Sequence, residues 1–400
     1  MAGLFQRRLS PPGPAPTPQE RDMALEGLRG LCALLVLYGH VFAPIPCLDP
    51  VYSPPDFFSW LDEARPAVLF FFVLSGYVIG LTVKSGIGGP AVRGYLGRRA
   101  LRLVPVNTAA VLMSWALAPR TPAGTVLGNL GFLQNYNVYL FGWHVPVMAN
   151  DASLWTLNFE VFYYLVFLAV WRYAPRVGVF MGFLALAAAT AAFSVFPPFL
   201  SCYVIGGLYW FAGLSVAWLG PRPEGHGNWP SALLATAVLW PVASFEVLLG
   251  RLDFPELNVP PLALKRLDLL AACLWLLLAT TGRSPRWQRR LGLLCLSLAT
   301  AALVLGWVSL EWRPRPALLA WLAPTGGVSF GIYAVSLALQ FSILFQPSLP
   351  RGTPWSYALR LALVVGLSTA IAWLLEHRLQ PALRRRFIAA RPAAALPRTG

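Results

Sequence analysis

Charged residues are scarce in this chain. Asp, Glu, Lys and Arg make up 12% of its 400 residues and 57% are hydrophobic, whereas a typical soluble domain carries about 25% charged residues. No stretch of domain length is polar enough to fold as a separate soluble unit. The scarcity of charge therefore argues against an ordinary soluble globular protein and indicates one that is embedded in a membrane.

Several patterns that carry well-known chemistry are also missing. The chain has no GxGxxG or Walker-type phosphate loop, no HExxH zinc motif and no GxSxG nucleophile elbow. Its five cysteines are scattered, without a CxxC pair or a His-rich pattern beside them. Phosphate loops, zinc hydrolysis, a serine elbow and a disulfide framework therefore have no support, and we expect no metal site and no tightly bound cofactor.

Long apolar runs recur along nearly the whole chain. About 20 apolar residues suffice for one transmembrane helix, and backbone in lipid must be paired internally, which leaves helices and closed barrels. The runs are too long and continuous for barrel strands, whose side chains would alternate. The sequence predicts an all-α, polytopic transmembrane helical bundle with about ten spans, drawn from ten or eleven apolar runs: 27–46, 66–83, 103–118, 153–171, 177–196, 201–219, 230–249, 267–281, 291–310, 326–346 and 355–376.

The ends of the chain differ from this region. Residues 1–20 contain the Pro-rich stretch PPGPAPTP, and residues 386–400 are basic and then rich in Ala and Pro, so both are predicted to be disordered tails around a transmembrane domain at 21–385. The basic segment after the second run should be cytoplasmic, and the acidic segment before it, which includes Asp49, should face the other side. This places the N-terminus in the cytoplasm, and we prefer ten crossings with both ends inside.

The net charge of +15 is spread over short inter-run segments and the two ends. This is the distribution of the positive-inside rule. No basic stripe interleaved with aromatic residues occurs on a polar domain, which nucleic-acid binding would require. Membrane lipids are therefore expected partners and nucleic acid is not.

A histidine lies inside the first apolar run, in ALLVLYGHVF. An ionisable group within a span is costly and is by default a candidate functional residue. Arg29 precedes His40 by eleven residues, about three helical turns, so the two share one helix face about 16 Å apart along the axis. Two interpretations remain open: an arginine at the cytoplasmic mouth of a cavity with a deep histidine, or a snorkelling arginine with a structural histidine.

A second group of basic residues lies in RRALRLVP. Arg99 and Arg102 are three residues apart and project from one helical region before Pro105, which should open the next span. Guanidinium forks bind phosphate oxygens well, which would suit a nucleotide-bearing donor such as coenzyme A. Ordinary anchoring at the cytoplasmic side explains the same arginines and, on this motif alone, is the stronger interpretation.

A carboxylate lies in the otherwise apolar run SLWTLNFEVFYYLVF. Glu160 should face the bundle interior and find a partner there. His40 or one of the arginines is the candidate for that partner, and a lone structural ion pair is the alternative. In FFFVLSGYVIG, Ser75 and Gly76 indicate close helix packing more readily than a nucleophile.

Taken in order, these motifs resemble those of the acyltransferase-3 family of integral-membrane O-acyltransferases. LEGLRGLCALLVLYGH is similar to the start of that family, with its Arg–ten residues–His signature at Arg29 and His40. FFFVLSGYVIG, RRALRLVP, SLWTLNFEVFYYL and VSFGIYAVS resemble its later motifs, and the resemblance covers roughly residues 22–385. Two positions depart from it: Glu26 stands where the family usually has Asp, and Ser336 where many members have His.

The resemblance implies transfer of an acyl group, often acetyl, from cytoplasmic acyl-CoA to a hydroxyl of a carbohydrate or of a related cell-surface or secondary-metabolite acceptor. Acyl-CoA would be a co-substrate, and the protein would lie in the bacterial cytoplasmic membrane. The donor residues would be Arg29, Arg99 and Arg102. His40 would deprotonate the acceptor hydroxyl or carry the acyl group, and Glu160 would orient its imidazole.

Two other functions remain compatible with the residues. In a transporter or flippase for a lipid-linked or anionic small molecule, the same ionisable groups would line a pathway. The lack of a visible internal repeat counts against a transporter, since transporters are often built from paired halves. A non-catalytic membrane scaffold is the third hypothesis.

Overall fold

The computed structural model describes residues 23–42, 48–55, 58, 64–83, 89–134, 145–172, several positions between 203 and 217, and 321–388. Throughout these ranges the regular structure is helical, and the only β pairing in them is an isolated bridge between Met148 and Asp151. The prediction of an all-helical chain is confirmed for this part of the molecule.

Within the described ranges, four helical segments are long and apolar enough to cross a membrane: Leu25–Phe42, Gly89–Leu117, Ala152–Arg172 and Pro354–Phe387. Two shorter apolar helices, Ala67–Thr82 and Ser329–Leu344, accompany them. The predicted runs at 177–196, 230–249, 267–281 and 291–310, and the tail at 1–20, lie outside the described residues. The count of about ten crossings and the cytoplasmic N-terminus therefore stay predictions.

The described helices fall into a long and a short group. The long ones are α2 (Met23–Phe42), α4 (Ala64–Thr82), α5 (Gly89–Leu117), α7 (Trp155–Arg172), α17 (Ser329–Leu344) and α18 (Pro354–Trp373). The short ones are α6 (Ala123–Leu130), the 3₁₀ turn η2 (Ala152–Leu154), α16 (Ala323–Gly326), the π-helical turn η5 (Leu374–Leu379) and α19 (Gln380–Ile388). Because α19 continues to Ile388, the first residues of the predicted tail at 386–400 are helical.

Helix α5 begins earlier than the apolar run predicted it to. It starts at Gly89, so the arginine-rich motif forms its first half and Pro105 lies inside the helix instead of opening it. Arginine is a good helix former, which lets the helix extend beyond its apolar part. Proline is tolerated inside transmembrane helices because neighbouring helices and side chains satisfy the freed backbone groups.

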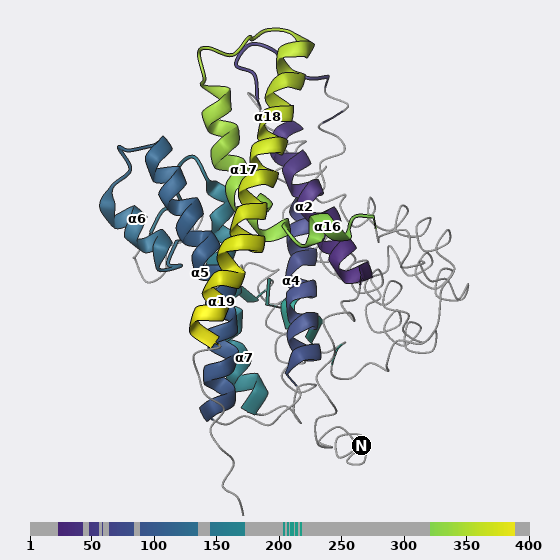
Figure 1. The fold of residues 1–400 in the computed structure, drawn as a ribbon, viewed down its shortest axis with the longest axis vertical. Coiled ribbons are helices and arrows are strands. Elements are labelled where there is room, and N and C mark those ends of the chain that lie inside the picture. The colour runs from purple at the N-terminus through teal and green to yellow at the C-terminus, as the bar shows by residue number, and fades with distance from the viewer. Residues whose placement is uncertain are drawn as a thin grey trace, which may run out of the picture.

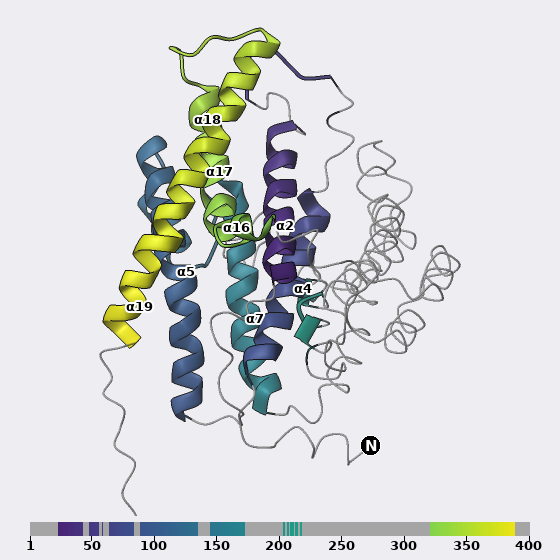
Figure 2. The same ribbon diagram turned by 45° about the vertical axis from the view of Figure 1, so that its right-hand side comes forward.

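The two views of the bundle show how these helices pack (Figures 1 and 2). Helix α17 contacts α18, α2 and α5, while α2 also contacts α4 and α16. Helices α18 and α19 form one long rod through η5 (Figure 2). The contact of α2 with α16 requires glycine, because a Cβ at Gly30 would lie 2.6 Å from the carbonyl oxygen of Leu322. This close approach brings the start of α17 beside the first turns of α2.

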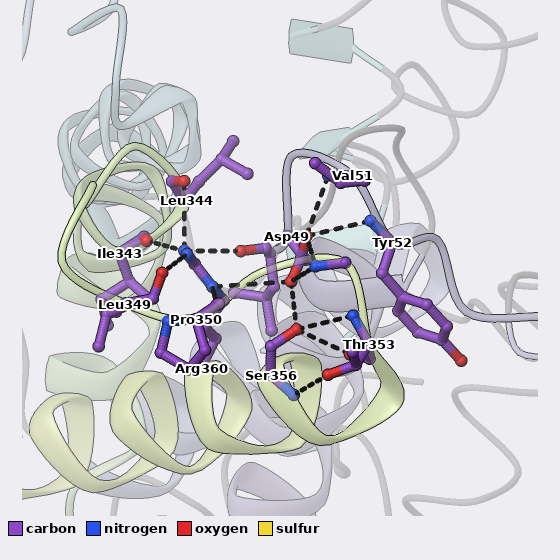
Figure 3. Close-up of polar contacts among 12 residues, drawn as sticks. Asp49, Val51, Tyr52, Ile343, Leu344, Leu349, Pro350, Thr353, Ser356 and Arg360 are labelled. Atoms are coloured by element: carbon purple, nitrogen blue, oxygen red, sulfur yellow. Dashed lines mark hydrogen bonds and ion pairs between the residues drawn. The ribbon is translucent and has the colours of Figure 1, made fainter.

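A buried ion pair joins Asp49, in the loop after α2, to Arg360 of α18 (Figure 3). Arg360 Nε lies 3.8 Å from Asp49 Oδ2, and the two side chains are 1% and 0% exposed. The guanidinium also donates hydrogen bonds to five backbone carbonyls, those of Leu48, Ile343, Leu344, Leu349 and Pro350. We call this network, with Asp49 and Arg360 at its centre, the clasp.

The acidic side of the clasp is equally well paired. Asp49 accepts a hydrogen bond from Ser356 Oγ at 2.6 Å and others from the backbone N–H groups of Val51, Tyr52 and Gly352. Burial by itself would raise the pKa of Asp49, but these bonds outweigh it and lower the pKa from 3.8 to about 2. The carboxylate is therefore ionised at neutral pH and fully paired, as a buried charge must be.

Candidate functional site

A cavity of about 80 Å³, apolar over most of its lining but containing ionisable side chains, lies among α2, α4, α5, α7 and α17. A single water needs roughly 10–15 Å³ measured in this way, so the space suits a few waters or one phosphate-sized group. Its walls combine charged, hydroxyl and aromatic side chains: Arg29, Val68, Phe71, Phe72, Leu74, Ser75, Arg102, Leu103, Thr156, Leu157, Glu160, Tyr164, Ser329, Phe330 and Tyr333.

Two of the three predicted donor arginines line this cavity from different helices. Arg29 extends from the second turn of α2, where its Nη1 pairs with Glu26 Oε1 at 3.1 Å, an i,i+3 contact on one helix face. Its side chain is 14% exposed. Arg102 enters from α5 and is half-buried. Two guanidinium groups thus share one small space, an arrangement that favours an anion.

The third arginine lies directly behind the cavity wall. The guanidinium carbon of Arg99 is 5.5 Å from the ring centre of Tyr164, a wall residue, and 5.7 Å from that of Tyr95. Such cation–π contacts hold a guanidinium without neutralising it. The hydroxyl of Tyr95 donates to the backbone carbonyl of Tyr164 at 3.3 Å, which fixes the position of the Tyr95 ring. Arg99 adds positive charge to the site without lining it.

Glu160 lies in the cavity with Ser75 as its hydrogen-bond partner. Ser75 Oγ on α4 donates to Glu160 Oε1 on α7, and Tyr164 Oη lies 3.5 Å from the same serine. Arg102 and Arg99 attract the carboxylate electrostatically. The partner is therefore a residue that the sequence pattern assigned to helix packing. The carboxylate belongs to the arginine-lined cavity.

Three wall residues share one face of α7, and sequence reasoning passed over two of them, Thr156 and Tyr164. Thr156, Glu160 and Tyr164 follow at intervals of four, the spacing that places side chains above one another on a helix. Thr156 Oγ1 is hydrogen-bonded to Tyr333 Oη of α17 at 2.8 Å. The i, i+4 spacing around an intramembrane carboxylate is the signal that would have found Thr156 and Tyr164; Tyr333 had no such signal.

Behind Tyr333 the polar contacts continue away from the cavity. Its hydroxyl donates to the backbone carbonyl of Ser153 at 2.7 Å, and Ser153 Oγ donates to Asp151 Oδ1 at 2.5 Å. Ser114 Oγ on α5 donates to the other carboxyl oxygen of Asp151 at 3.3 Å. These bonds tie α5, η2 and α17 together where they meet the cavity.

His40 lies elsewhere on α2. It is not among the cavity wall residues, in keeping with a separation from Arg29 of about 16 Å along the helix. The backbone around it is tied to the last two long helices: Gln340 Nε2 donates to the carbonyl of His40 at 2.6 Å, and Tyr357 Oη donates to that of Val41 at 2.7 Å. The structure therefore brings Arg29, Arg102 and Glu160 together and places His40 toward the clasp end of the same helix.

Ser336, which replaces the histidine of many acyltransferase-3 sequences, lies in the middle of α17. It is 1% exposed, and its hydroxyl makes no hydrogen bond among the described residues. It does not line the cavity. Within the described ranges, no group of three His, Cys, Asp or Glu side chains is placed to hold a metal ion.

Apolar membrane-length helices around a cavity that contains Arg29, Arg102 and Glu160 define the class: a multi-pass membrane protein with ionisable side chains grouped inside its helical bundle. A family model described as an acyltransferase domain, that of acyltransferase-3, matches residues 23–377 of the 400. The chain belongs to this family, so its activity class is acyl transfer. No curated protein and no solved structure matches the chain.

Proposed function

We propose that the protein transfers an acyl group, acetyl in the first instance, from cytoplasmic acyl-CoA to a hydroxyl of a carbohydrate or related acceptor. The observation that carries this proposal is the meeting of Arg29 and Arg102 with the Glu160–Ser75 pair in one buried cavity. Phosphates are the anionic part of acyl-CoA, and guanidinium forks match phosphate oxygens in geometry and charge.

The separation of the charged cavity from His40 fits the shape of such a donor. In acyl-CoA the phosphates and the thioester stand at opposite ends of a long flexible arm. With a phosphate group between Arg29 and Arg102, the arm would extend along α2, and the thioester would lie toward His40. The imidazole would then accept the proton of the attacking hydroxyl as a general base, the hydroxyl oxygen would form the new ester bond as the thioester C–S bond breaks, and the imidazolium would return the proton to the departing thiolate of coenzyme A.

Glu160 has a more specific part in this scheme than orienting the histidine. Its carboxylate, held by Ser75, lies among Arg29, Arg102 and Arg99. Two carboxylates, Glu160 and the Glu26 that pairs with Arg29, limit the mutual repulsion of the three guanidinium groups and leave a net positive charge for a phosphate. Glu160 would thus shape the donor site, and His40 would do the proton transfer.

The test uses purified protein in lipid nanodiscs with labelled acetyl-CoA and a glycan acceptor. His40→Ala should lower kcat by roughly 100-fold or more, the usual contribution of a general base. Arg102→Met should raise the KM for acetyl-CoA about tenfold, because hydrogen bonds to charged groups contribute about 1.5–3 kcal/mol each. Arg93→Met, an exposed arginine on the same helix, is the matched control and should leave both constants unchanged.

Two results would overturn the proposal. Unchanged transfer in His40→Ala would exclude the histidine as the base, and equal KM values for Arg102→Met and Arg93→Met would exclude the cavity as the donor site. Flux of a glycan or anionic substrate across liposomes in the absence of acyl-CoA would favour the transporter instead.

A further inference from the structure

The last helical rod is interrupted by a π-helical turn at the level of the cavity. Residues Leu374–Leu379 form η5 between α18 and α19, and Glu376 lies in it. A π-helical turn has one more residue per hydrogen-bonded turn than an α-helix and is rare. Where such turns occur, they are frequently at functional sites. The irregularity changes the direction in which the side chains of this turn, including that of Glu376, project from the helix.

The carboxylate of Glu376 reaches the start of α17. Its Oε1 accepts a hydrogen bond from the backbone N–H of Gly331 at 2.5 Å. Gly331 is the third residue of α17, and the N–H groups of the first turn have no partner within their own helix. Val328, at the N-cap position, makes no side-chain capping bond. Glu376 therefore caps α17 from another helix, with its negative charge at the positive end of the helix dipole.

The backbones of the two helices touch at this point. A Cβ on Gly331 would lie 2.6 Å from Ala372 Cβ, 2.7 Å from Ala372 Cα and 3.0 Å from Glu376 Oε1. Glycine is thus required for the carboxylate to reach the N–H group. The contact depends on the length of the Glu376 side chain, because the helix axes are already as close as packing allows.

One turn further on, the same rod is attached to α5. Gln380, which is 5% exposed, donates from Nε2 to the backbone carbonyl of Arg102 at 2.8 Å. The rod is therefore bound to both elements that carry one side of the cavity: Arg102 and Leu103 on α5, and Ser329, Phe330 and Tyr333 on α17. Glu376 itself does not line the cavity.

We propose that Glu376 is a positioning residue for the donor site, which holds the N-terminus of α17 in register with Arg102 through its bond to Gly331. This inference rests on the proposed function, since the property it affects is the binding of acyl-CoA. The carboxylate also interacts electrostatically with Arg102, Arg29 and Glu26. The hydrogen bond from the Gly331 N–H at 2.5 Å is the stronger constraint, because it is short and directional.

Two conservative variants separate the reach of the side chain from its charge. Glu376→Gln keeps the length and an acceptor oxygen but loses the charge. Glu376→Asp keeps the charge but is one methylene too short to reach Gly331. We expect Glu376→Gln to keep the KM for acetyl-CoA within threefold of wild type. Glu376→Asp and Glu376→Ala should raise it about tenfold, the range of a lost helix cap.

The readout is the KM for acetyl-CoA against the KM for the acceptor and kcat, all in nanodiscs. A role in folding alone would reduce the active fraction, and hence the apparent kcat, without changing either KM. A role in positioning the donor site would raise only the KM for acetyl-CoA. Arg385→Ala, an exposed change on α19, controls for general disturbance of the rod. If Glu376→Ala does not accumulate, the KM values of Glu376→Gln and Glu376→Asp for acetyl-CoA test the proposal without it.

The inference is overturned if Glu376→Asp has the wild-type KM for acetyl-CoA, or if Glu376→Gln is as impaired as Glu376→Asp. Either result leaves the proposed function standing as long as the wild-type protein transfers the acyl group. If wild-type protein shows no transfer from acetyl-CoA, the proposed function fails, and the inference fails with it.

Discussion

Replacing Arg360 with methionine removes the cation of the clasp while keeping most of the side-chain volume. In the folded protein this side chain is fully buried and donates to five backbone carbonyls in addition to its pairing with Asp49. The variant therefore leaves a buried carboxylate without its cation and several carbonyls without a donor. Both effects act in the same direction, against the folded state.

The expected loss follows from this pairing. Removing one partner of a buried ion pair costs about 3–5 kcal/mol, and each buried carbonyl left unsatisfied adds about 1–3 kcal/mol unless water reaches it. The carbonyls lie at chain connections and can bind water when the structure relaxes. We therefore expect the loss of the ion pair to make the larger contribution. Arg360→Met should lower the free energy of unfolding by about 3–5 kcal/mol.

The measurement is unfolding by SDS in mixed micelles, followed by far-ultraviolet circular dichroism. Arg351→Met is the control. Arg351 is an exposed arginine in the connection between α17 and α18, and its replacement should change stability by less than about 0.5 kcal/mol. In a double-mutant cycle, Asp49→Asn and Arg360→Met together should cost less than the sum of the two single changes by about 0.5–3 kcal/mol. Equal stabilities of Arg360→Met and Arg351→Met, or strictly additive single effects, would refute the reasoning.

Further predictions concern the stability of the protein at low pH and the residues that line the cavity. Because the pKa of Asp49 is lowered from 3.8 to about 2, its contribution to stability should be complete above about pH 4 and be lost as the pH falls toward 2; Asp49→Asn should flatten that part of the pH–stability curve. Glu160→Gln and Ser75→Ala should each raise the KM for acetyl-CoA several-fold and leave the KM for the acceptor unchanged, and an equal rise in both constants would contradict the assignment to the donor site. Tyr333→Phe, which loses the hydroxyl bonds to Thr156 and to the Ser153 carbonyl, should destabilise the protein by about 1–3 kcal/mol, measurable as a lower midpoint in the same SDS titration.

A helical membrane protein, and the ionisable residues inside its apolar runs, could be predicted from the sequence. Continuous apolar runs commit the chain to helices, since no other open backbone structure satisfies its polar groups in lipid. An ionisable side chain inside such a run is costly wherever it packs, so Arg29, His40 and Glu160 stood out without knowledge of any contact. The ordered motifs then indicated the acyltransferase-3 family, which the match over residues 23–377 confirms.

The partners of those residues could not be predicted, because they come from helices that are distant in the sequence. Ser75 meets Glu160 across 85 residues, and Glu376 meets Gly331 across 45. Helix periodicity gives the face on which a side chain lies but neither the neighbour of that face nor the axial offset between two helices. Asp49 is the clearest example. The sequence identified it only as an acidic residue in a loop, whereas in the folded protein it forms a buried ion pair with Arg360.

For the candidate site, the sequence by itself determined which side chains are too polar for their surroundings. The tertiary structure alone decided how they are grouped: Arg29, Arg102 and Glu160 line one cavity, and His40 lies about three turns away toward the clasp. The physical reason is that the cost of burying a charge depends on the local segment, whereas the means of compensating for it depends on which helices pack together.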